Sequence, residues 1–501
     1  MDLFANLAVG FGAALDPVNM MYCFLGVLLG TIIGVLPGVG PTATISMLLP
    51  VTYYLGPEAS LIMLAGIYYG SQYGGSTTAI LINLPGEVSS SVTALDGYPM
   101  AQKGRGGAAL TIAALGSFVA GSFATLLIAL LAVPLSRLAL QFGSTEYFSL
   151  IVLGVFMATA LAHGSVIKAI AMIVMGMLFG TVGTDIYSGQ YRFIFGDVRL
   201  TDGLPVVAVA LGVFGLAEIM RNVGGAGQSV GSAAKVKSLL PTREELMASI
   251  APIVRGTLLG SLLGTLPGGG SILSAFSSYA LEKKISKTPE RFGHGAIEGV
   301  AGPESANNAG AQTSFIPMLT LGIPSNALMA LLAGALMIQG ITPGPNVVHQ
   351  QPELFWGVIA SMWIGNAMLV VLNLPLVGVW VSLLKIPYRY MVPAIVAFST
   401  IGVYAMNSQP LDVYVLMAFG LFGYLLSRLG CEPAPLLLGF VIGPLLEDHL
   451  RRALVLSNGD FLVFFRSPIS LTLLLITAGV LLLASLPAIA SRREKVFVED
   501  D

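Results

Sequence analysis

Hydroxyl and amide side chains gather beside four proline-containing turns in this chain, which is otherwise strongly apolar. Such groups donate hydrogen bonds to a carboxylate. A helix start beside them adds backbone N–H groups without burying a lysine or arginine in a membrane. For any single residue, helix capping or packing between helices explains the side chain equally well. The candidate substrate or ion site comprises Pro37, Gly38, Gly40, Thr42, Thr44, Ser76, Thr77, Thr78, Asn83, Pro267, Gly268, Gly270, Ser271, Asn307, Asn308, Gln312, Thr313, Ser314, Ser325 and Asn326.

Two acids near these turns, Glu304 and Asp96, are candidates for proton or ion coupling. Glu304 stands between Pro303 and Asn307, within a polar run. A structural or loop role is the stronger interpretation for every acid near the turns. Backbone carbonyls and hydroxyls at an interrupted helix would also suit Na⁺, so the coupling cation is Na⁺ or H⁺.

The turns belong to a duplicated stretch. Residues 26–40 and 256–270 are identical at nine of fifteen positions, and both end in Leu-Pro-Gly-x-Gly. Glycine at every fourth residue gives a smooth helix face for close packing, and the Pro-Gly that follows must interrupt the helix. Inside a membrane, an interrupted helix is tolerated where its free backbone groups line a polar cavity, which favours a transporter site. The alternative is a pair of structural turns at the membrane surface.

Composition predicts the class of protein. The 501 residues are 55% hydrophobic and only 10% charged, which is typical of a polytopic membrane protein. We therefore expect an all-α fold with roughly 10–12 transmembrane helices plus interrupted or re-entrant hairpins. No basic patch suits nucleic acid, and the four histidines lack metal-ligand spacing. The sequence thus predicts no metal site, no cofactor and no nucleic-acid partner.

The duplication divides the chain into two membrane repeats, 1–222 and 250–501, the second with a basic tail. A Gly/Ser-rich and then charged segment, 223–249, is the predicted cytoplasmic linker. In the first repeat we expect helices at 17–36 and 58–73, the second running into the polar run 74–78. In the second repeat we expect a helix at 250–266 and a long span at 353–383.

Basic residues orient the two repeats, because Lys and Arg concentrate in cytoplasmic loops. The hairpin 250–284 lies between basic loops at 235–243 and 283–291, whereas no Lys or Arg precedes Lys103 around the matching hairpin 17–55. The two structural repeats are therefore predicted to be inverted across the membrane. Arg221 and Arg451 disagree, since they end corresponding helices in both halves.

Several longer motifs resemble the large membrane subunit of the bacterial tripartite tricarboxylate transporters. The resemblance extends over nearly the whole chain, and the motifs that carry it are the segments 30–44, 73–81, 83–87, 96–101, 303–308, 319–324 and 435–447. The resemblance implies cation-driven uptake of a tricarboxylate or related, citrate-like carboxylate across the bacterial inner membrane. It also implies two partners, a small membrane subunit and a periplasmic substrate-binding protein.

Two other functions stay open. A passive anion channel or permease without coupling would share the apolar helices, although inverted hairpins favour alternating access. An intramembrane enzyme is the weaker alternative, because the chain has no His-Glu-x-x-His, Gly-x-Gly-Asp or Gly-x-Ser-x-Gly motif. The chain is therefore predicted not to be an enzyme.

The inverted arrangement can be tested by labelling cysteines from each side of the membrane. Pro57→Cys should react with an impermeant reagent from the periplasm, and Ser286→Cys should react from the cytoplasm. The reason is the difference in basic residues between the two flanking loops. Labelling of both positions from the same side would refute the inversion.

Overall fold

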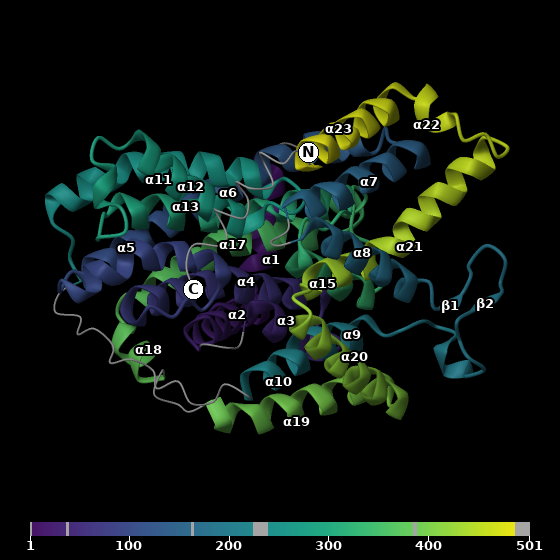
Figure 1. Ribbon diagram of the computed structural model, residues 1–501, viewed down its shortest axis with the longest axis horizontal. Helices are drawn as coiled ribbons and strands as arrows, with labels where there is room; N and C mark the ends of the chain where they lie inside the picture. Colours follow the sequence, from purple (N-terminus) through teal and green to yellow (C-terminus); the bar gives the residue numbers. More distant parts are fainter. Residues whose placement is uncertain (1–2, 37–39, 162–164, 224–238, 384–387, 486–501) are drawn as a thin grey trace.

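The computed structural model describes residues 3–36, 40–161, 165–223, 239–383 and 388–485. Nearly all of them are helical, as the apolar composition predicts, and the described residues hold one short antiparallel strand pair. Figure 1 shows the helices running largely side by side, with the strand pair projecting beyond one end of the bundle. The prediction of an all-α membrane protein is confirmed.

The first half of the chain contains ten α-helices and the strand pair within the described ranges. Their bounds are α1 Leu3–Ala14, α2 Pro17–Val35, α3 Pro41–Thr52, α4 Pro57–Ile82, α5 Ser91–Gln102, α6 Gly106–Ala139, α7 Ser144–Leu161, α8 Val166–Gly180, β1 Gly183–Thr184, β2 Tyr191–Arg192, α9 Val206–Ala210 and α10 Ala217–Val223. A π-helical segment, Leu211–Leu216, joins α9 to α10.

The second half continues with helices only, as far as the structure describes it. Their bounds are α11 Arg243–Gly264, α12 Gly270–Ile285, α13 Glu298–Thr313, α14 Phe315–Leu321, α15 Ala327–Ile338, α16 Val347–Gln350, α17 Pro352–Asn373, α18 Val377–Leu383, α19 Tyr388–Asn407, α20 Pro410–Arg428, α21 Pro433–Leu456, α22 Val463–Arg466 and α23 Pro468–Ser485.

Five helices of the described chain are long and apolar enough to cross a membrane: α2, α6, α11, α17 and α20. Other apolar helices, such as α8 and α15, are shorter. A bilayer core takes about 20 helical residues, so the shorter helices cross it only in part or in combination. The predicted total of roughly 10–12 crossings stays a prediction.

Helix α2 packs against α4 through its glycine face. A Cβ at Gly26, Gly30 or Gly34 would overlap the backbone carbonyl of Met63, Ile67 or Ser71 on α4. The contacts advance by four residues on both helices, as expected when two rows of small residues let helix backbones touch.

Helix α11 packs against α13 in the same way. A Cβ at Gly256, Gly260 or Gly264 would overlap the carbonyl of Gly302, Ala306 or Gly310, again four residues apart. The duplicated glycines therefore make duplicated contacts, which supports a common plan for the two halves. Whether the halves are inverted across a membrane stays a prediction.

Both predicted interruptions are present. Helix α2 ends at Val35 and α3 begins at Pro41, while α11 ends at Gly264 and α12 begins at Gly270. The turn residues Pro37 and Gly38 lie outside the described residues. The later turns also correspond, because α4 is followed by Asn83 (φ 56°) and α14 by Gly322 (φ 75°), both left-handed.

Three expectations about helix boundaries were wrong. Helix α4 does not stop at residue 73 but continues to Ile82, because Gly74 packs on α2 and so serves close approach instead of a turn. Helix α11 begins at Arg243, inside the predicted linker, because Thr242 and Glu245 cap it reciprocally. The expected span 353–383 is divided after Asn373 into α17 and α18.

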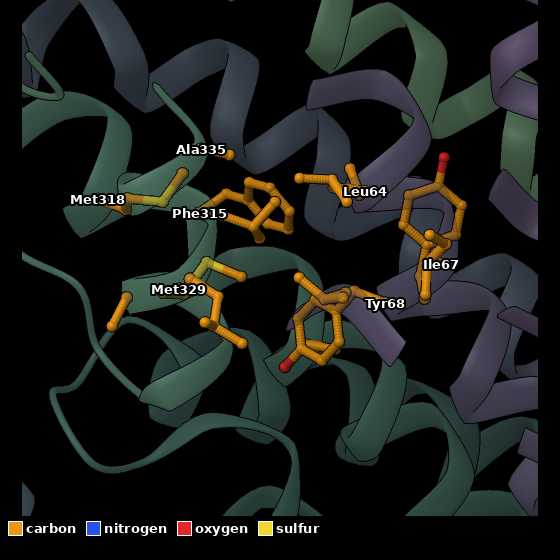
Figure 2. Close-up of a cluster of buried hydrophobic side chains, with 14 of the residues drawn as sticks. Leu64, Ile67, Tyr68, Phe315, Met318, Met329 and Ala335 are labelled. Atoms are coloured by element: carbon orange, nitrogen blue, oxygen red, sulfur yellow. The ribbon is translucent and has the colours of Figure 1, made fainter. Parts of the chain in front are cut away.

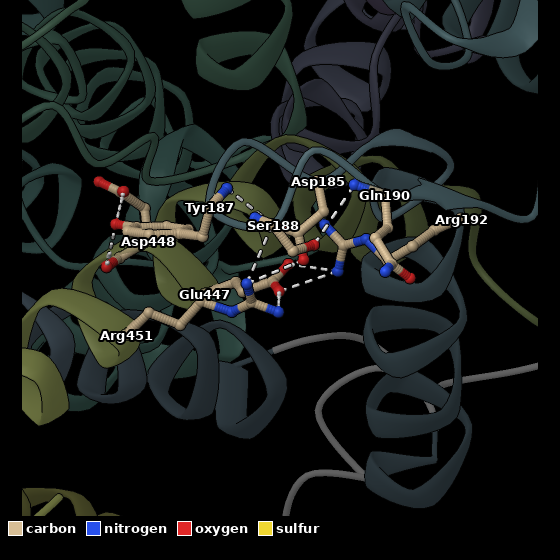
Figure 3. A network of polar contacts seen from close by, with 8 residues as sticks. All are labelled: Asp185, Tyr187, Ser188, Gln190, Arg192, Glu447, Asp448 and Arg451. Atoms are coloured by element: carbon tan, nitrogen blue, oxygen red, sulfur yellow. Dashed lines mark hydrogen bonds and ion pairs between the residues drawn. The ribbon is translucent and has the colours of Figure 1, made fainter.

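The strand pair is tied to α21 by ion pairs (Figure 3). The Arg451 guanidinium donates to both oxygens of Asp185, at 3.0 and 2.9 Å, and Arg192 donates to Glu447 at 2.9 Å. Asp185 also accepts the backbone N–H of Tyr187 at 2.9 Å. These contacts join a loop that precedes α9 to a helix about 260 residues later in the chain.

Asp185 makes this connection dependent on pH. The backbone N–H of Tyr187 and the Arg451 guanidinium lower the pKa of the Asp185 carboxyl to about 2, compared with about 3.9 in an unfolded chain. A lowered pKa stabilises the attachment above pH 3.9, and the stabilisation is lost as the pH falls through about 2. The protection of residues 183–192 against hydrogen exchange, taken relative to the intrinsic exchange rate at each pH, should therefore fall from pH 4 to pH 2.

Asp185→Asn is the matched variant for this prediction. It keeps the side-chain size but cannot carry charge, so exchange should already be faster at pH 6 and should depend less on pH. Equal protection in the variant and the parent chain would show that the ion pair does not hold the hairpin.

Candidate functional site

The second interruption closes on the loop between α14 and α15. The backbone N–H of Gly268 donates to the carbonyl of Ser325 at 2.6 Å. Ser325 Oγ donates to the carbonyl of Ser314 at 3.3 Å, and Asn326 Nδ2 lies 3.5 Å from Ser314 Oγ. A Cβ on Gly270 would lie 3.2 Å from Asn326 Nδ2. Five predicted site residues are thus brought together by the fold.

Gly268 is required by its conformation as well as its surroundings. Its φ is +77°, and a Cβ there would lie 2.6 Å from the Cα of Ala158 on α7. Pro267 lies against Gly154, which is also on α7. Alanine at 268 would therefore combine a left-handed backbone with a collision, at a cost of about 1–3 kcal/mol for the backbone alone. Ser271 follows in the first turn of α12 and is buried.

An apolar cluster separates this loop from α4 (Figure 2). Figure 2 shows Tyr68 and Leu64 of α4 facing Phe315 of α14 and Met329 of α15. The rings of Tyr68 and Phe315 are 6.3 Å apart between centroids, and both residues are buried. This packing fixes the position of the α14–α15 loop relative to the first half of the chain.

The first interruption closes in a similar way. A Cβ at Gly86 would overlap the carbonyl of Gly34, so the loop after α4 lies directly on the end of α2. Gly40 precedes α3, and its carbonyl accepts the hydroxyl of Thr44 at 3.1 Å. Thr42 lies in the first turn of α3, and its carbonyl accepts Ser46 Oγ at 2.7 Å.

Glu304 is the centre of a second polar group. It lies on α13 and is fully buried. Its Oε2 accepts the hydroxyl of Ser76 on α4 at 2.6 Å, and its Oε1 accepts the hydroxyl of Thr93 on α5. A buried carboxylate is stable only with such donors. The two hydroxyls come from α4 and α5, so the group joins three helices of the chain, with α13 supplying the carboxylate.

A small cavity of about 10 Å³ adjoins Glu304, with room for about one water molecule. Its polar lining contains the predicted residues Ser76, Thr77 and Glu304. The remaining lining residues were not predicted, and they are Tyr73, Leu110, Ala113, Ala114, Ser117, Asn373, Leu374 and Val377. Thr93 was also missed, because only the fold brings α5, α6 and α17 against α13.

The expectation that the clustered hydroxyls stand at helix starts was wrong for two groups. Ser76, Thr77 and Thr78 lie inside α4, and their hydroxyls donate to carbonyls of the preceding turn. Asn307, Asn308, Gln312 and Thr313 likewise lie inside α13. These side chains therefore act from helix faces and do not accompany free backbone N–H groups.

Asp96 makes its contacts with a different part of the chain. Its Oδ1 accepts the backbone N–H groups of Gly293, Gly295 and Ala296 at 2.8–2.9 Å, and Tyr279 donates to its Oδ2 at 3.0 Å. The carboxylate thereby holds the loop that precedes α13. This geometry favours a structural role for Asp96, while a coupling role stays a prediction.

A second carboxylate, the half-buried Glu87, lies in the loop after α4. It accepts the hydroxyl of Ser71. Ser89 Oγ lies 3.4 Å from Glu87 Oε2 and donates to Gln72 Oε1 at 3.1 Å. Because the Gln72 carbonyl also accepts Ser76 Oγ, α4 connects the surroundings of both carboxylates.

Comparison with known proteins identifies the family. A family model described as "Tripartite tricarboxylate transporter TctA family" matches residues 20–438. The chain belongs to this family. The match includes both interruptions and the Glu304 group.

Two curated relatives come from Agrobacterium vitis. The chain is 62% identical over 501 residues to an "Uncharacterized 52.8 kDa protein in TAR-I ttuC' 3'region", covering all of both chains. It is 64% identical over 242 residues to an "Uncharacterized protein in TAR-II ttuC' 3'region", covering 48% of this chain and all of that protein. No solved structure matches the chain.

Family membership makes the chain a transporter subunit with several membrane-spanning helices. Within the described residues, no group of three or more His, Cys, Asp or Glu side chains could hold a metal ion. The polar groups described at the site are hydroxyls, amides, backbone groups, the buried carboxylate of Glu304 and the half-buried carboxylate of Glu87.

Glu304→Gln tests whether the buried carboxylate takes part in transport. The variant keeps size and shape but exchanges two charge-assisted hydrogen bonds for neutral ones, a loss of about 1–2 kcal/mol in stability. If Glu304 couples transport, uptake in vesicles should fall at least tenfold while the amount of inserted protein stays near normal. Leu126→Ala, at an exposed apolar position of α6, is the control, and normal uptake by Glu304→Gln would assign Glu304 to structure alone.

Proposed function

We propose that the chain is the translocating subunit of a secondary active transporter that takes up a tricarboxylate or a related, citrate-like carboxylate. Uptake is driven by a Na⁺ or H⁺ gradient across the bacterial inner membrane. Membership of the TctA family supports this proposal most strongly. The family name also supports two partners, which we take to be a small membrane subunit and a periplasmic substrate-binding protein.

The paired interruptions support a substrate site between the halves. Each interruption lies against the loop that follows the partner helix, so backbone groups and polar side chains meet at both places. In the second, the Gly268 N–H is taken by the Ser325 carbonyl, and the amide of Asn326 beside Ser314 is the neutral donor closest to the turn. Such donors would hold a carboxylate without a buried lysine or arginine.

The exposure of the arginine side chains in the described residues supports recognition of the anion by neutral donors. In the ion pairs of the described residues, every arginine side chain is at least 29% exposed, including that of Arg255, which pairs with the buried Glu282 at the end of α12. A buried cation in a membrane is costly. We therefore assign recognition of the anion to neutral hydrogen-bond donors. The cation gradient drives the uptake.

Gradient-driven uptake in proteoliposomes tests the proposal. The chain is reconstituted with its small membrane subunit, and labelled citrate is supplied with an inward Na⁺ or H⁺ gradient. We expect accumulation above the external concentration only when the periplasmic binding protein is added, because capture by that protein raises the local substrate concentration.

The controls separate the alternatives. Equilibration without accumulation, unaffected by either gradient, would indicate a passive channel and contradict the proposal. Equal accumulation with and without the binding protein would contradict the proposed partner. A panel of other labelled di- and tricarboxylates then identifies the substrate.

A further inference from the structure

A row of polar side chains runs along the buried face of α13 toward α6. Glu304, Asn308 and Gln312 are spaced four residues apart and therefore lie on one face of the helix. All three are fully buried. Residues four and eight positions beyond Glu304 lie about 6 and 12 Å further along the axis. The row thus leads from the Glu304 cavity to a separate place deeper between the helices.

Helix α6 carries a matching row. Ser117 and Thr125 flank Gly121 at the same four-residue spacing, and both hydroxyls meet α13. Asn308 Nδ2 donates to Ser117 Oγ at 2.7 Å, and Thr125 Oγ1 donates to Gln312 Oε1 at 2.5 Å. The two helices are therefore joined by side-chain hydrogen bonds on either side of Gly121.

A third helix completes the far end of the row. Asn366 of α17 is fully buried, and neither its Oδ1 nor its Nδ2 has a hydrogen-bond partner among the described residues. The Nε2 atom of Gln312 has none either. Both amides converge on Gly121, since a Cβ there would lie 2.8 Å from Gln312 Nε2 and 2.9 Å from each polar atom of Asn366.

Unpartnered amides in a dry interior are unfavourable, and native proteins seldom leave them so. The O and N atoms of an amide are interchangeable in shape, so Gln312 and Asn366 can equally direct their oxygens toward Gly121. Gln312 then donates an N–H to Thr125 Oγ1, and the single Thr125 proton goes to the Gly121 carbonyl at 2.8 Å, which leaves the hydroxyl oxygen one further lone pair. The place then offers neutral oxygen atoms from three helices.

We propose that Gly121, Thr125, Gln312 and Asn366 form a binding site for a small monovalent cation, Na⁺. Hard cations take oxygen ligands. The set contains no carboxylate to neutralise a divalent ion and no group that holds a proton near neutral pH. Gly121 lets both amides approach α6 closely, because a Cβ there would lie within 2.9 Å of them. As the coupling-ion site, this assignment rests on the proposed transport function, although binding can be measured without transport.

Thermal unfolding of the purified chain in detergent tests the site, with NaCl, KCl and choline chloride compared at equal ionic strength. A ligand that binds the folded state raises the melting temperature in proportion to the logarithm of its concentration. We expect NaCl to raise it above the value in choline chloride. Thr125→Val and Asn366→Leu should weaken the apparent Na⁺ affinity at least tenfold, and binding of ²²Na⁺ should fall in parallel.

Conservative and remote variants keep the test decisive. Thr125→Ser keeps the oxygen and should keep Na⁺ binding, and Leu126→Ala should behave as the parent chain. If Asn366→Leu fails to fold, the pair Thr125→Val and Thr125→Ser carries the comparison. No Na⁺-specific shift in the parent chain, or equal shifts in Thr125→Val and Thr125→Ser, would overturn the site and leave a bridging water there.

The measurement needs neither carboxylate nor partner subunits, so its failure is distinct from a failure of the proposed function. Accumulation of carboxylate without Na⁺ binding would leave transport standing with a proton as the coupling ion. Na⁺ binding without carboxylate accumulation would keep the site and overturn the transport proposal.

Discussion

Direct contact between helix backbones is the constraint on which the other features depend. Lipid tails are as apolar as leucine, so helices in a membrane gain little from hiding apolar side chains from one another. Association then comes from close packing, and glycine rows allow the backbone of α2 to touch that of α4 and α11 to touch α13. Extra methyl groups at such contacts cost about 1–3 kcal/mol each in a well-packed interior. The spacing of four residues is therefore fixed by geometry and tolerates little change.

The same contact places the interruptions. Because α2 and α4 stay in register to their ends, the end of α2 meets the loop after α4, where Gly86 lies on Gly34. The equivalent meeting in the second half joins Gly268 to Ser325. An interrupted helix frees backbone groups, and here the partner loop supplies their contacts. Packing and site formation are thus consequences of one arrangement.

Sequence reasoning predicted the all-α class and both interruptions, because Leu-Pro-Gly-x-Gly leaves a helix little alternative. It erred at Gly74, since a glycine that permits close approach and a glycine that permits a turn are identical in sequence. It also expected free helix starts at Asn308, yet α13 continues through Pro303. Pro303 is the sixth residue of α13, beyond the first four N–H groups that have no partner within the helix, so α13 continues although one of its hydrogen bonds is missing.

The candidate site was predictable only in part. Ser76 and Glu304 were both selected as polar residues near the turns, and the fold brings them to 2.6 Å. Ser117 and Asn366 are scattered polar residues on mostly apolar helices, and Thr93 is one of several polar residues around the start of α5, so nothing in the local sequence distinguishes them. Their importance arises from neighbours that lie many residues away along the chain, and such pairings require the fold.

The Asp96 contacts connect the two halves of the chain. The carboxylate of Asp96 on α5 accepts three backbone N–H groups of the loop before α13. Arg105, which lies between α5 and α6, donates to Glu245 of α11 at 2.7 Å. The first and second halves are therefore fastened together at this end of the bundle. A fastening at one end restricts any relative movement of the two halves at that end. The second interruption lies at the end of α11 remote from Glu245, so it would be displaced further than the residues beside the fastening.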